Sequence, residues 1–344
     1  AANAAVDGYG INGSAHEPQL VSGRAAAGHP FDGPVSDGQA VRILTGASVP
    51  PGVDRIALQE EVTVTATHVH LPGTLKQGAN IRAAGEDIAA GAIVFAQGHR
   101  LRPVDLGVLA SVGVGQVQVY ERLTVAVLST GDELQPPGAP AHDYQIYDAN
   151  RPMLLAQVAA WGFDVVDVGI IPDDRASVRA ALNQAARADI ILTSGGASAG
   201  DEDHIAALLN ETGSMALWRI AIKPGRPLGL GVWNGTPVFA LPGNPVAAFV
   251  CTFLFGQPAM NVLAGAGFST PKRLTLPAAF AKRKKPGRRE YLRARVTADG
   301  VETFGSEGSG RISGLSWAEG LVELPDHAVT IAPGDRVTFI PFVQ

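Results

Sequence analysis

The amino-acid sequence predicts a multidomain α/β protein in which a central Rossmann-like α/β domain is flanked by a β-rich N-terminal domain and a small C-terminal β domain. Its 344 residues exceed the roughly 150 residues of a common domain. From residue 123 onward, apolar strands alternate with amphipathic helices, which is the pattern of a parallel α/β sheet. On either side of that region, short apolar runs alternate with Gly and Pro turns, as in small β domains.

The composition is that of a globular protein, with 46% hydrophobic and 17% charged residues. The formal net charge of -5 and the lack of a long basic tract disfavour nucleic-acid binding. The single cysteine, Cys251, excludes an internal disulfide and a four-thiolate metal site, and we expect a cytoplasmic protein. The opening residues AANAAVDGYG do not have the pattern of a signal peptide, and we expect no stretch to approach the roughly 20 uncharged apolar residues of a membrane span.

The strands and helices are predicted from hydrophobic periodicity and turn residues. The β-rich unit at 1–82 should contain strands at 40–44, 55–58 and 62–67, and the connector at 83–121 a helix near 104–111 and a strand at 115–120. The α/β domain at 122–269 should contain strands at 123–128, 163–171, 189–193, 217–222 and 238–241, and helices at 152–161, 175–187, 204–211 and 245–255. The β domain at 270–344 should contain strands at 289–296 and 335–342, beside the basic stretch KRKKPGRR (282–289).

Three loops that follow predicted strands carry candidate ligand residues, because open parallel sheets bind ligands beyond the carboxyl ends of their strands. Their glycines let backbone amides approach an anion, and the N-terminal end of a helix attracts negative charge. Tight turns also need glycine for geometry alone, so only the three loops together make the argument. The candidates are Ser129, Thr130 and Gly131 in the first loop, Ser194, Gly195, Gly196 and Ser198 in the second, and Gly243 and Asn244 in the third.

Two further pairs of residues are candidates beside these loops. Asn150 and Asn244 are both predicted helix N-caps, and Asp148 beside Asn150 either contacts a ligand or solvates its turn. Lys223 and Arg226 lie three residues apart on a stiff proline turn, which suits an oxyanion; a solvated turn is the alternative.

Acidic residues in Gly-containing loops favour a divalent cation. Such loops contain Asp7, Glu86 and Asp87, Asp132 and Glu133, and the three acids at 201–203. Surface solvation is the usual fate of acidic residues, but carboxylates that border anion-binding loops repel the ligand unless a hard cation such as Mg2+ bridges them. The histidines show no zinc-ligand spacing. The residues alone therefore predict an α/β enzyme that handles a phosphorylated ligand.

Ten motifs, taken in order, resemble those of the molybdopterin molybdenumtransferases, the molybdate-inserting enzymes of molybdenum cofactor synthesis, to which the C-terminal domain of gephyrin is related. They are VDGYG (6–10), VRILTGASVPPGVDRI (41–56), IRAAGEDI (81–88), STGDEL (129–134), IYDANRP (146–152), SGGASAGDEDHI (194–205), IKPGRP (222–227), LPGNPVAAF (241–249), GRREYLRA (287–294) and SGRISGLSWAEGL (309–321). The resemblance covers essentially the whole chain.

The resemblance implies a molybdopterin-binding α/β domain at 122–269, a remnant of a dimerisation domain at 83–121, and a barrel-like C-terminal domain. It implies that molybdate is inserted into adenylylated molybdopterin with Mg2+-dependent hydrolysis of the adenylate, which releases molybdenum cofactor and AMP. A homodimer, and contacts with the adenylyltransferase and with molybdoenzyme acceptors, belong to the same expectation.

The resemblance also assigns roles to residues. Asp203, Glu133, Asp87 and Asp7 would form the catalytic acidic set, the first three as magnesium ligands and Asp203 foremost. Ser198, Lys223, Arg226 and Arg293 would face the oxyanion. Gly314 falls where family members often carry a Ser, which leaves Ser313 alone as the serine at that place.

Two other functions fit parts of the sequence. A molybdopterin adenylyltransferase shares the α/β domain but would not need the flanking segments. A non-catalytic, gephyrin-like scaffold would tolerate loss of the four acidic residues, which are all present. The sequence also begins at the DGY motif, without the helical segment that family members carry before it, so we expect weaker dimerisation.

Overall fold

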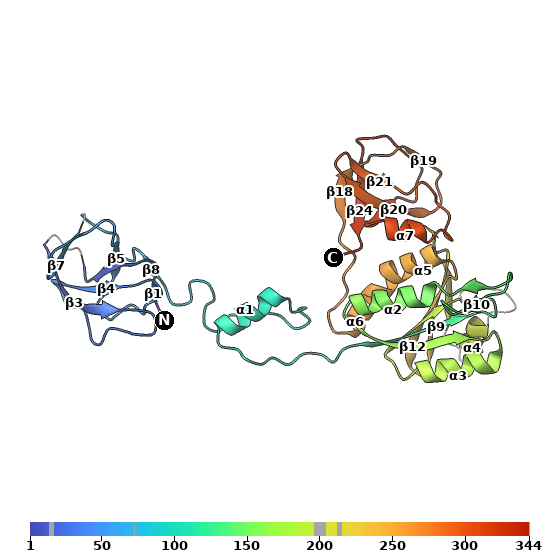
Figure 1. Cartoon of the computed structure of the whole chain (residues 1–344), viewed down its shortest axis with the longest axis horizontal. Helices are drawn as coiled ribbons and strands as arrows, with labels where there is room; N and C mark the ends of the chain where they lie inside the picture. Colours follow the sequence, from blue (N-terminus) through green and yellow to red (C-terminus); the bar gives the residue numbers. More distant parts are fainter. Residues whose placement is uncertain (14–16, 72, 196–203, 212–214, 344) are drawn as a thin grey trace. The chain divides into compact units, whose positions relative to one another are not determined.

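The computed structural model describes the chain except for residues 14–16, 72, 196–203, 212–214 and 344 (Figure 1). The chain divides into two compact units. Unit 1 comprises Ala1–Ala96 and Leu101–Gly115, and unit 2 comprises Gln97–Arg100 and Gln116–Gln344. Each unit has its own hydrophobic core.

Unit 1 is built on a six-stranded sheet in the order β5-β2-β4-β3-β7-β6. Its strands are β2 (Gly8–Ile11), β3 (Gln19–Ala25), β4 (Gln39–Ile43), β5 (Arg55–Leu58), β6 (Thr63–Val64) and β7 (His68–His70). A separate pair joins β1 (Asn3–Ala4) to β8 (Ile81–Arg82), and α1 spans Pro103–Ser111. The predicted β-rich unit and the helix near 104–111 are confirmed.

The glycines of the VDGYG motif allow β2 to pack closely against its neighbours. A Cβ on Gly8 would lie 1.9 Å from the carbonyl oxygen of Ala57, and a Cβ on Gly10 would lie 2.8 Å from a methyl carbon of Val53. Both distances are too short for a side chain, so these two glycines have a packing role.

The α/β domain of unit 2 has a six-stranded sheet in the order β12-β9-β13-β17-β16-β14. Its strands are β9 (Thr124–Thr130), β12 (Asp164–Ile171), β13 (Ile190–Ser194), β14 (Ala216–Arg219), β16 (Pro227–Trp233) and β17 (Thr236–Leu241). The first four strands in this order are parallel, as predicted, but β16 pairs antiparallel with both of its neighbours, β17 and β14. The sheet is therefore mixed, because Asn234 and Gly235 close a tight hairpin between β16 and β17 with positive φ angles of 49° and 86°.

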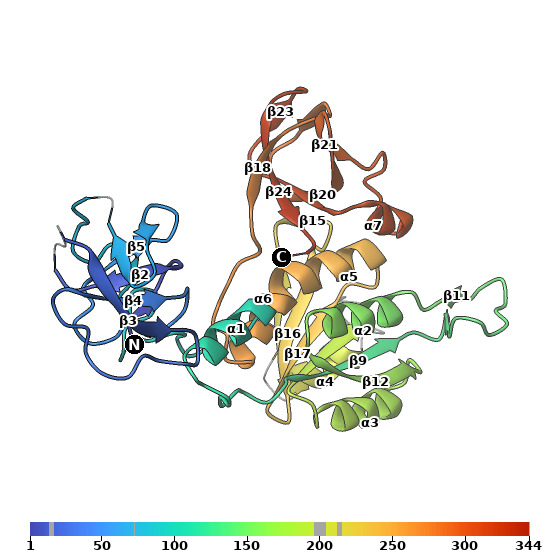
Figure 2. The ribbon, with the colours of Figure 1, turned by 60° about the vertical axis from the view of Figure 1, so that its left-hand side comes forward.

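Helices cover both faces of this sheet (Figure 2). On one face lie α2 (Asn150–Ala160) and α5 (Pro245–Cys251), and on the other lie α3 (Arg175–Ala185) and α4 (His204–Glu211). Successive residues of β9 alternate between the two cores: Val125 and Val127 belong to one, Ala126 and Leu128 to the other. The central strand is thus apolar throughout because both of its faces are buried.

One helical run corrects the expectation about membrane spans. α5 continues through the π-helical turn Thr252–Gly256 into α6 (Gln257–Leu263), and the combined Pro245–Leu263 is long and apolar enough to cross a membrane by length and composition. The prediction that no stretch approaches this length is therefore wrong. In the structure, 67% of the apolar window is buried inside the protein, as expected of a core helix.

The C-terminal β domain forms a sheet in the order β15-β20-β22-β24-β18, with β21 paired to β20. The strands are β15 (Ile222–Lys223), β18 (Leu274–Pro277), β20 (Arg289–Thr297), β21 (Gly300–Thr303), β22 (Gly320–Leu324) and β24 (Arg336–Pro341). β19 (Lys282–Lys284) pairs with β23 (Val329–Ile331), and the helix α7 spans Ser313–Trp317. A small parallel pair, β10 (Leu134–Gln135) and β11 (Ile146–Tyr147), extends from the α/β domain.

The α/β domain and the C-terminal β domain share one hydrophobic core. The ring of Phe342 packs edge-on against Phe249 at 4.8 Å and against Phe253 at 5.7 Å between centroids. Leu321 and Ile340 of the β domain belong to the same buried cluster. The two domains are therefore packed as one body within unit 2.

Three predicted strands differ from the structure. Of the strand predicted at 62–67, only β6 forms, and the chain then bends before β7 begins at His68. Residues 115–120 form no strand, and their apolar side chains Val117 and Val119 are exposed. The strand predicted at 217–222 is broken after Arg219 into β14 and β15, which pair with different sheets.

Candidate functional site

The predicted loops meet at the carboxyl ends of β9, β13 and β17. Asn150, in the first turn of α2, holds two of them together: its side-chain amide donates to Ser194 Oγ at 2.7 Å and to the carbonyl oxygen of Gly243 at 2.6 Å. The amide of Gly195 donates to the carbonyl oxygen of Leu241 at 3.2 Å. Gly196, Ser198 and Asp203 lie outside the described residues.

The prediction that Asn150 caps α2 is wrong. Asn150 is the first helical residue, and Ala149 occupies the N-cap position. The carboxylate of Asp148 satisfies the helix end instead, because it accepts from the Arg151 amide at 3.1 Å and pairs with Arg151 Nε at 3.0 Å. Asp148 is buried and has a structural role, which leaves the Asn150 amide directed at the loops.

Two buried oxygens at this edge have no hydrogen-bond partner among the described residues. They are Ser129 Oγ, at the end of β9, and Asn150 Oδ1. An unpartnered buried polar group costs roughly 1–3 kcal/mol, a cost that a ligand or solvent molecule would remove. Thr130 and Gly131 follow Ser129, and Gly131 adopts a φ of 147°, which is accessible mainly to glycine.

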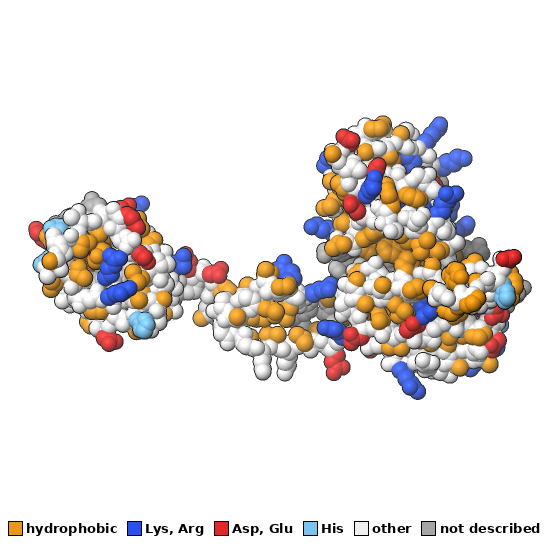
Figure 3. All heavy atoms as spheres, viewed as in Figure 1, with side chains coloured by type: hydrophobic (Ala, Val, Ile, Leu, Met, Phe, Trp, Pro, Cys, Tyr) orange, Lys and Arg blue, Asp and Glu red, His pale blue; other side chains and the backbone are white. Residues whose placement is uncertain are grey.

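A cleft of about 400 Å³ lies where the loops face the C-terminal β domain. Lysine and arginine side chains project from that β domain (Figure 3). The residues lining the cleft include the predicted Gly195, Gly243, Asn244, Lys223 and Arg226, and in addition Arg288. This brings five of the predicted residues together.

Arg288 is a cleft residue that the sequence analysis did not identify. It belongs to the basic stretch 282–289, which was noted only as a charged segment. The parallel pairing of β15 with β20 places this stretch beside the proline turn. Arg288 and Arg226 are both exposed, and neither has an ion-pair partner in the part of the chain that the structure describes. Two unpaired guanidinium groups in one cleft suit an anionic ligand.

The helix α5 starts at the cleft. Asn244 is its N-cap and Pro245 its first residue, as predicted, although the Asn244 side chain makes no capping hydrogen bond. The amide of Val246 donates to the carbonyl oxygen of Ser309 at 3.1 Å. The N-terminal end of this helix was a candidate anion site, but the Val246 amide in its first turn is not free to bind an anion.

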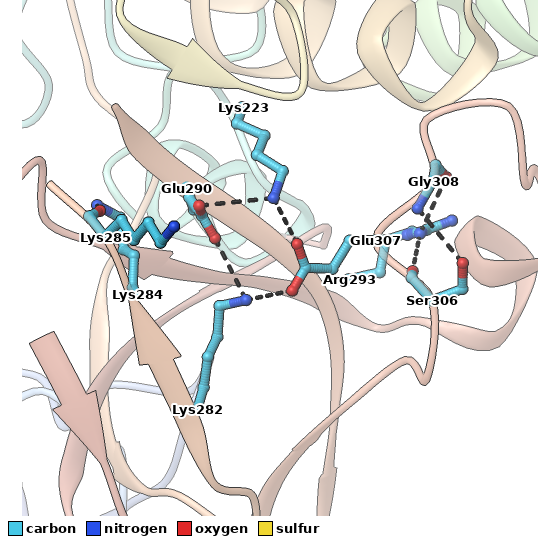
Figure 4. A network of polar contacts seen from close by, with 9 residues as sticks. All are labelled: Lys223, Lys282, Lys284, Lys285, Glu290, Arg293, Ser306, Glu307 and Gly308. Carbon is cyan, nitrogen blue, oxygen red and sulfur yellow. Dashed lines mark hydrogen bonds and ion pairs between the residues drawn. The ribbon is translucent and has the colours of Figure 1, made fainter. Parts of the chain in front are cut away.

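Lys223 belongs to a ring of alternating charges, together with Glu290, Lys282 and Glu307 (Figure 4). Glu290 lies 3.6 Å from Lys223 Nζ and 3.3 Å from Lys282 Nζ, and the Glu307 carboxylate contacts both ammonium groups. Burial lowers the pKa of Lys223, but Glu307 and Glu290 outweigh burial, so its pKa lies above the ordinary value. Hydrogen bonds from Lys223 and Lys282 lower the pKa of Glu307 to about 2.

Arg293 lies beside the cleft, in a second cavity that Lys223 also lines. Its buried guanidinium donates to the carbonyl oxygens of Arg311 at 2.5 Å, of Gly308 at 3.2 Å and of Ser306. Burial, with a smaller effect of Arg311, lowers the pKa of Arg293. The structure thus differs from the expectation that Arg293 faces an oxyanion, because three of its hydrogen bonds hold the loop 304–312.

Ser313 is exposed at the start of α7, and its neighbour Gly314 is buried. A Cβ on Gly314 would lie 2.6 Å from Arg293 Nη1 and 2.7 Å from Phe304 Cδ1. The guanidinium of Arg293 therefore occupies the space that a serine side chain at position 314 would need. The buried position of the Arg293 guanidinium therefore requires glycine at position 314.

The acidic candidates are divided between the units. In unit 1, Asp7 accepts from the Thr45 amide at 2.7 Å and from its hydroxyl at 2.8 Å, and these bonds lower the pKa of Asp7. Asp87 is exposed in the same unit, and Glu133 is exposed in unit 2. Outside the gaps in the description, no group of three or more His, Cys, Asp or Glu is placed to hold a metal ion.

The fold and the cleft define a multidomain α/β protein with a cation-lined cleft between a Rossmann-like domain and a C-terminal β domain. Three family models match the chain: "MoeA N-terminal region (domain I and II)" over residues 1–113, "Probable molybdopterin binding domain" over 126–262 and "MoeA C-terminal region (domain IV)" over 275–342. Together they cover both units.

Related proteins agree with these matches. A molybdopterin molybdenumtransferase of Haemophilus influenzae is 36% identical over 99% of this chain and 87% of that protein. A relative from Nostoc with the same name is 31% identical over 97% of this chain and 81% of its own length. The crystal structure of a molybdopterin biosynthesis protein from Pyrococcus horikosii covers 100% of this chain and 88% of its own, with a TM-score of 0.82 and 28% identity. The chain belongs to the molybdopterin molybdenumtransferase family, a family of transferases in molybdenum cofactor biosynthesis.

Proposed function

We propose that the chain inserts molybdate into adenylylated molybdopterin and that hydrolysis of the adenylate releases AMP. The single observation that supports this most is the cleft in which the loops after β13 and β17 face Lys223, Arg226 and Arg288. Backbone amides and guanidinium groups suit the phosphates of an adenylylated pterin. The three cations Lys223, Arg226 and Arg288, here called the cationic wall, suit molybdate, a dianion. Water would attack one phosphorus of the phosphoanhydride bond that joins the pterin phosphate to AMP. Its oxygen would remain on that phosphate, and the other phosphate would leave, so that AMP is released.

We propose Mg2+ as the cation of this reaction. Mg2+ is usually held by one or two carboxylates together with phosphate and water oxygens, so a three-acid cluster is not required. Glu133, exposed at the end of β9, has the donor chemistry for this role, as Asp87 and Asp203 do by resemblance. The bound cation would offset the repulsion between carboxylates and phosphates.

We also propose a homodimer in which α1 contributes to the contact. Val104 and Leu106 of α1 are 65% and 56% exposed, although both are apolar. Figure 3 shows hydrophobic side chains on this segment. Asp7 and Asp87 of unit 1 would reach the active cleft of a partner subunit. Apolar side chains on one helix are typical of a subunit interface.

The reaction is tested by adding molybdate to the purified chain loaded with adenylylated molybdopterin and measuring AMP. Release that requires both molybdate and Mg2+ is expected. Full AMP release in excess chelator would refute the magnesium proposal, and no release under any condition would refute the transferase reaction.

The cationic wall is tested with Arg226→Ala. Because the guanidinium would bind the dianion, the molybdate concentration for half-maximal rate should rise about tenfold or more, and the pterin requirement less. Arg283→Ala is the matched control, since it removes an exposed arginine of the same basic region that does not line the cleft. An equal rise for both substrates would place Arg226 on the pterin.

A further inference from the structure

The ring of Lys223, Glu290, Lys282 and Glu307 is electrically neutral. Two ammonium groups face two carboxylates, so the pair of lysines offers no net charge to an incoming anion. Lys223 is nevertheless one of the residues that line the cleft, and Glu307 lines the same cleft. One of the two carboxylates must leave before Lys223 can attract an oxyanion.

The two carboxylates are held differently. Glu290 lies in β20, opposite Lys223 in the strand register, and its side chain is 13% exposed. Glu307 lies in the loop 304–312, between β21 and α7, and its side chain is 46% exposed. Water and a neighbouring cleft are available to a released Glu307 but not to Glu290. Glu307 is therefore the carboxylate that can move at lower cost.

The backbone around Glu307 is fixed on both sides. Arg293 binds the carbonyl oxygens of Ser306 and Gly308, and the amide of Val246 binds that of Ser309. A rotation of the Glu307 side chain about its own bonds therefore releases the lysines without a movement of the loop. Such a rotation changes only rotamers, which exposed side chains exchange rapidly.

We propose that Glu307 is a specificity-determining residue of the cleft: its carboxylate occupies Lys223 and Lys282 until a doubly charged oxyanion displaces it. This inference rests on the proposed molybdate-binding function. Once Glu307 has rotated away, Lys223, Lys282 and Glu290 carry a net charge of about one, and Arg226 and Arg288 add to it. A dianion gains from this field more than a monoanion, which must compete with a carboxylate of its own charge. The low pKa of Glu307, about 2, means that the competing carboxylate is fully charged at neutral pH.

The inference is tested by Glu307→Gln and equilibrium binding of molybdate to the full chain, measured by calorimetry without pterin. The neutral amide competes less well for the lysines, so molybdate should bind about three- to tenfold more tightly than to the wild type. The affinity for nitrate, a monoanion, should increase by a larger factor. The preference for molybdate over nitrate should therefore be smaller in the variant than in the wild type. Sulfate, a dianion without molybdenum, should follow molybdate.

Glu302→Gln is the matched control, because Glu302 pairs with Arg295 on the neighbouring hairpin and does not line the cleft. Its affinity for molybdate should equal that of the wild type. Glu307→Asp, which keeps the charge but shortens the side chain, should fall between wild type and Glu307→Gln, and serves if the glutamine variant is unstable.

Unchanged or weaker molybdate binding by folded Glu307→Gln overturns the inference, as does the absence of measurable molybdate and sulfate binding in both proteins. The AMP assay separates the two proposals. Tighter binding by the variant without AMP release by the wild type would refute the reaction alone. AMP release without tighter binding would refute the role of Glu307 alone.

Discussion

Arg293 is a buried arginine whose partners are carbonyl oxygens rather than carboxylates. It is 4% exposed, and its guanidinium stacks on the ring of Phe304 at 4.9 Å. Charge-assisted hydrogen bonds of this kind are stronger than neutral ones, and the planar fork can reach several carbonyls at once. The family resemblance implied an oxyanion contact for Arg293. In the structure, Arg293 instead holds the loop 304–312, which carries Glu307.

Arg293→Ala should lower the free energy of unfolding by about 2–4 kcal/mol, because buried carbonyl oxygens lose their donors and a cavity forms. Urea denaturation gives this value. Arg295→Ala is the control: its exposed guanidinium lies over Trp317 at 4.6 Å and pairs with Glu302, so its loss should cost less than about 1 kcal/mol. Equal losses for the two variants would contradict the assigned role of Arg293.

Gly314→Ala should also destabilise the protein, by roughly 1–3 kcal/mol, since a methyl group would displace Arg293 or Phe304. The melting temperature measures the effect. Gly305→Ala makes a suitable comparison, because a Cβ there meets nothing within 4 Å. If both variants had the same melting temperature as the wild type, the packing between Gly314 and Arg293 would not be tight.

Glu307 also gives a pH dependence whose sign follows from its lowered pKa. The pKa in the folded protein is about 2, against an ordinary 4.5, so the ionised carboxylate favours the folded state. Its contribution is present in full above about pH 4.5 and is lost as the pH falls through about 2. The stability difference between wild type and Glu307→Gln, measured in urea, should therefore shrink over this range. A difference that grew on acidification would contradict the ion pairs.

Sequence reasoning at the residue scale found the polar candidates but not always their partners. Both Asp148 and Asn150 were singled out, but the capping role predicted for Asn150 belongs to Asp148, because either side chain can satisfy a helix end and only the position of α2 decides. Arg288 was not distinguished from its neighbours, since a stretch with six cations among eight residues (282–289) carries no sign of which cation faces a cleft.

At the scale of elements, the proline turn between β15 and β16 packs against a buried thiol. Cys251 of α5 is fully buried, and its Sγ lies 3.6 Å from the carbonyl oxygen of Gly225. Burial raises the pKa of Cys251 to about 12, so this thiol is a packing group rather than a nucleophile. The helix α5 thus packs against the turn that carries Lys223 and Arg226 and helps to position it.

Gly225→Ala should disturb this turn. Gly225 has a φ of 107°, and a Cβ would lie 2.6 Å from Cys251 Sγ. We expect a stability loss of about 2 kcal/mol or more and weaker molybdate binding. Gly235→Ala separates the two causes, because its φ of 86° is also positive while its Cβ would meet nothing within 4 Å. Similar losses in both variants would show that backbone strain alone acts at Gly225.

Elements with strong periodicity were predictable, and elements defined by pairing were not. The helix α4 and the strand β5 were predicted at their observed bounds. The strand β16 was missed, although Asn234 and Gly235 are the strongest short hairpin signal in the sequence. The alternation at 115–120 indicated a strand, but alternation without a partner strand cannot form a ladder.

At the scale of the whole molecule, the sequence predicted the order of the domains but not the contacts that complete the cleft. These contacts join Lys223 to Glu290 and Val246 to Ser309, over separations that no local pattern records. Likewise, the charged residues in the sequence could not predict that Lys223 forms ion pairs with Glu290 and Glu307. Long-range pairing is decided by packing, which composition and periodicity do not encode.

The proposed dimer gives a prediction at this scale. Leu106→Asp in α1 should shift the association equilibrium toward monomer, with specific activity that rises with protein concentration. Sedimentation velocity measures the shift. Ile93→Asp, at an apolar position that is 86% exposed outside α1, is the comparison. If Leu106→Asp assembled like the wild type, α1 would not be part of the interface.

The shared core of the α/β domain and the C-terminal β domain also constrains the order of events during synthesis. The mixed sheet of the α/β domain and its helices are complete once residue 263 has left the ribosome, but Phe342 closes the core on Phe249, and β24 lies between β22 and β18. Until then the apolar face of Pro245–Leu263 lacks its cover. This long apolar helix therefore remains partly uncovered while some eighty further residues are translated, and exposed hydrophobic surface of this kind favours aggregation until the β domain folds.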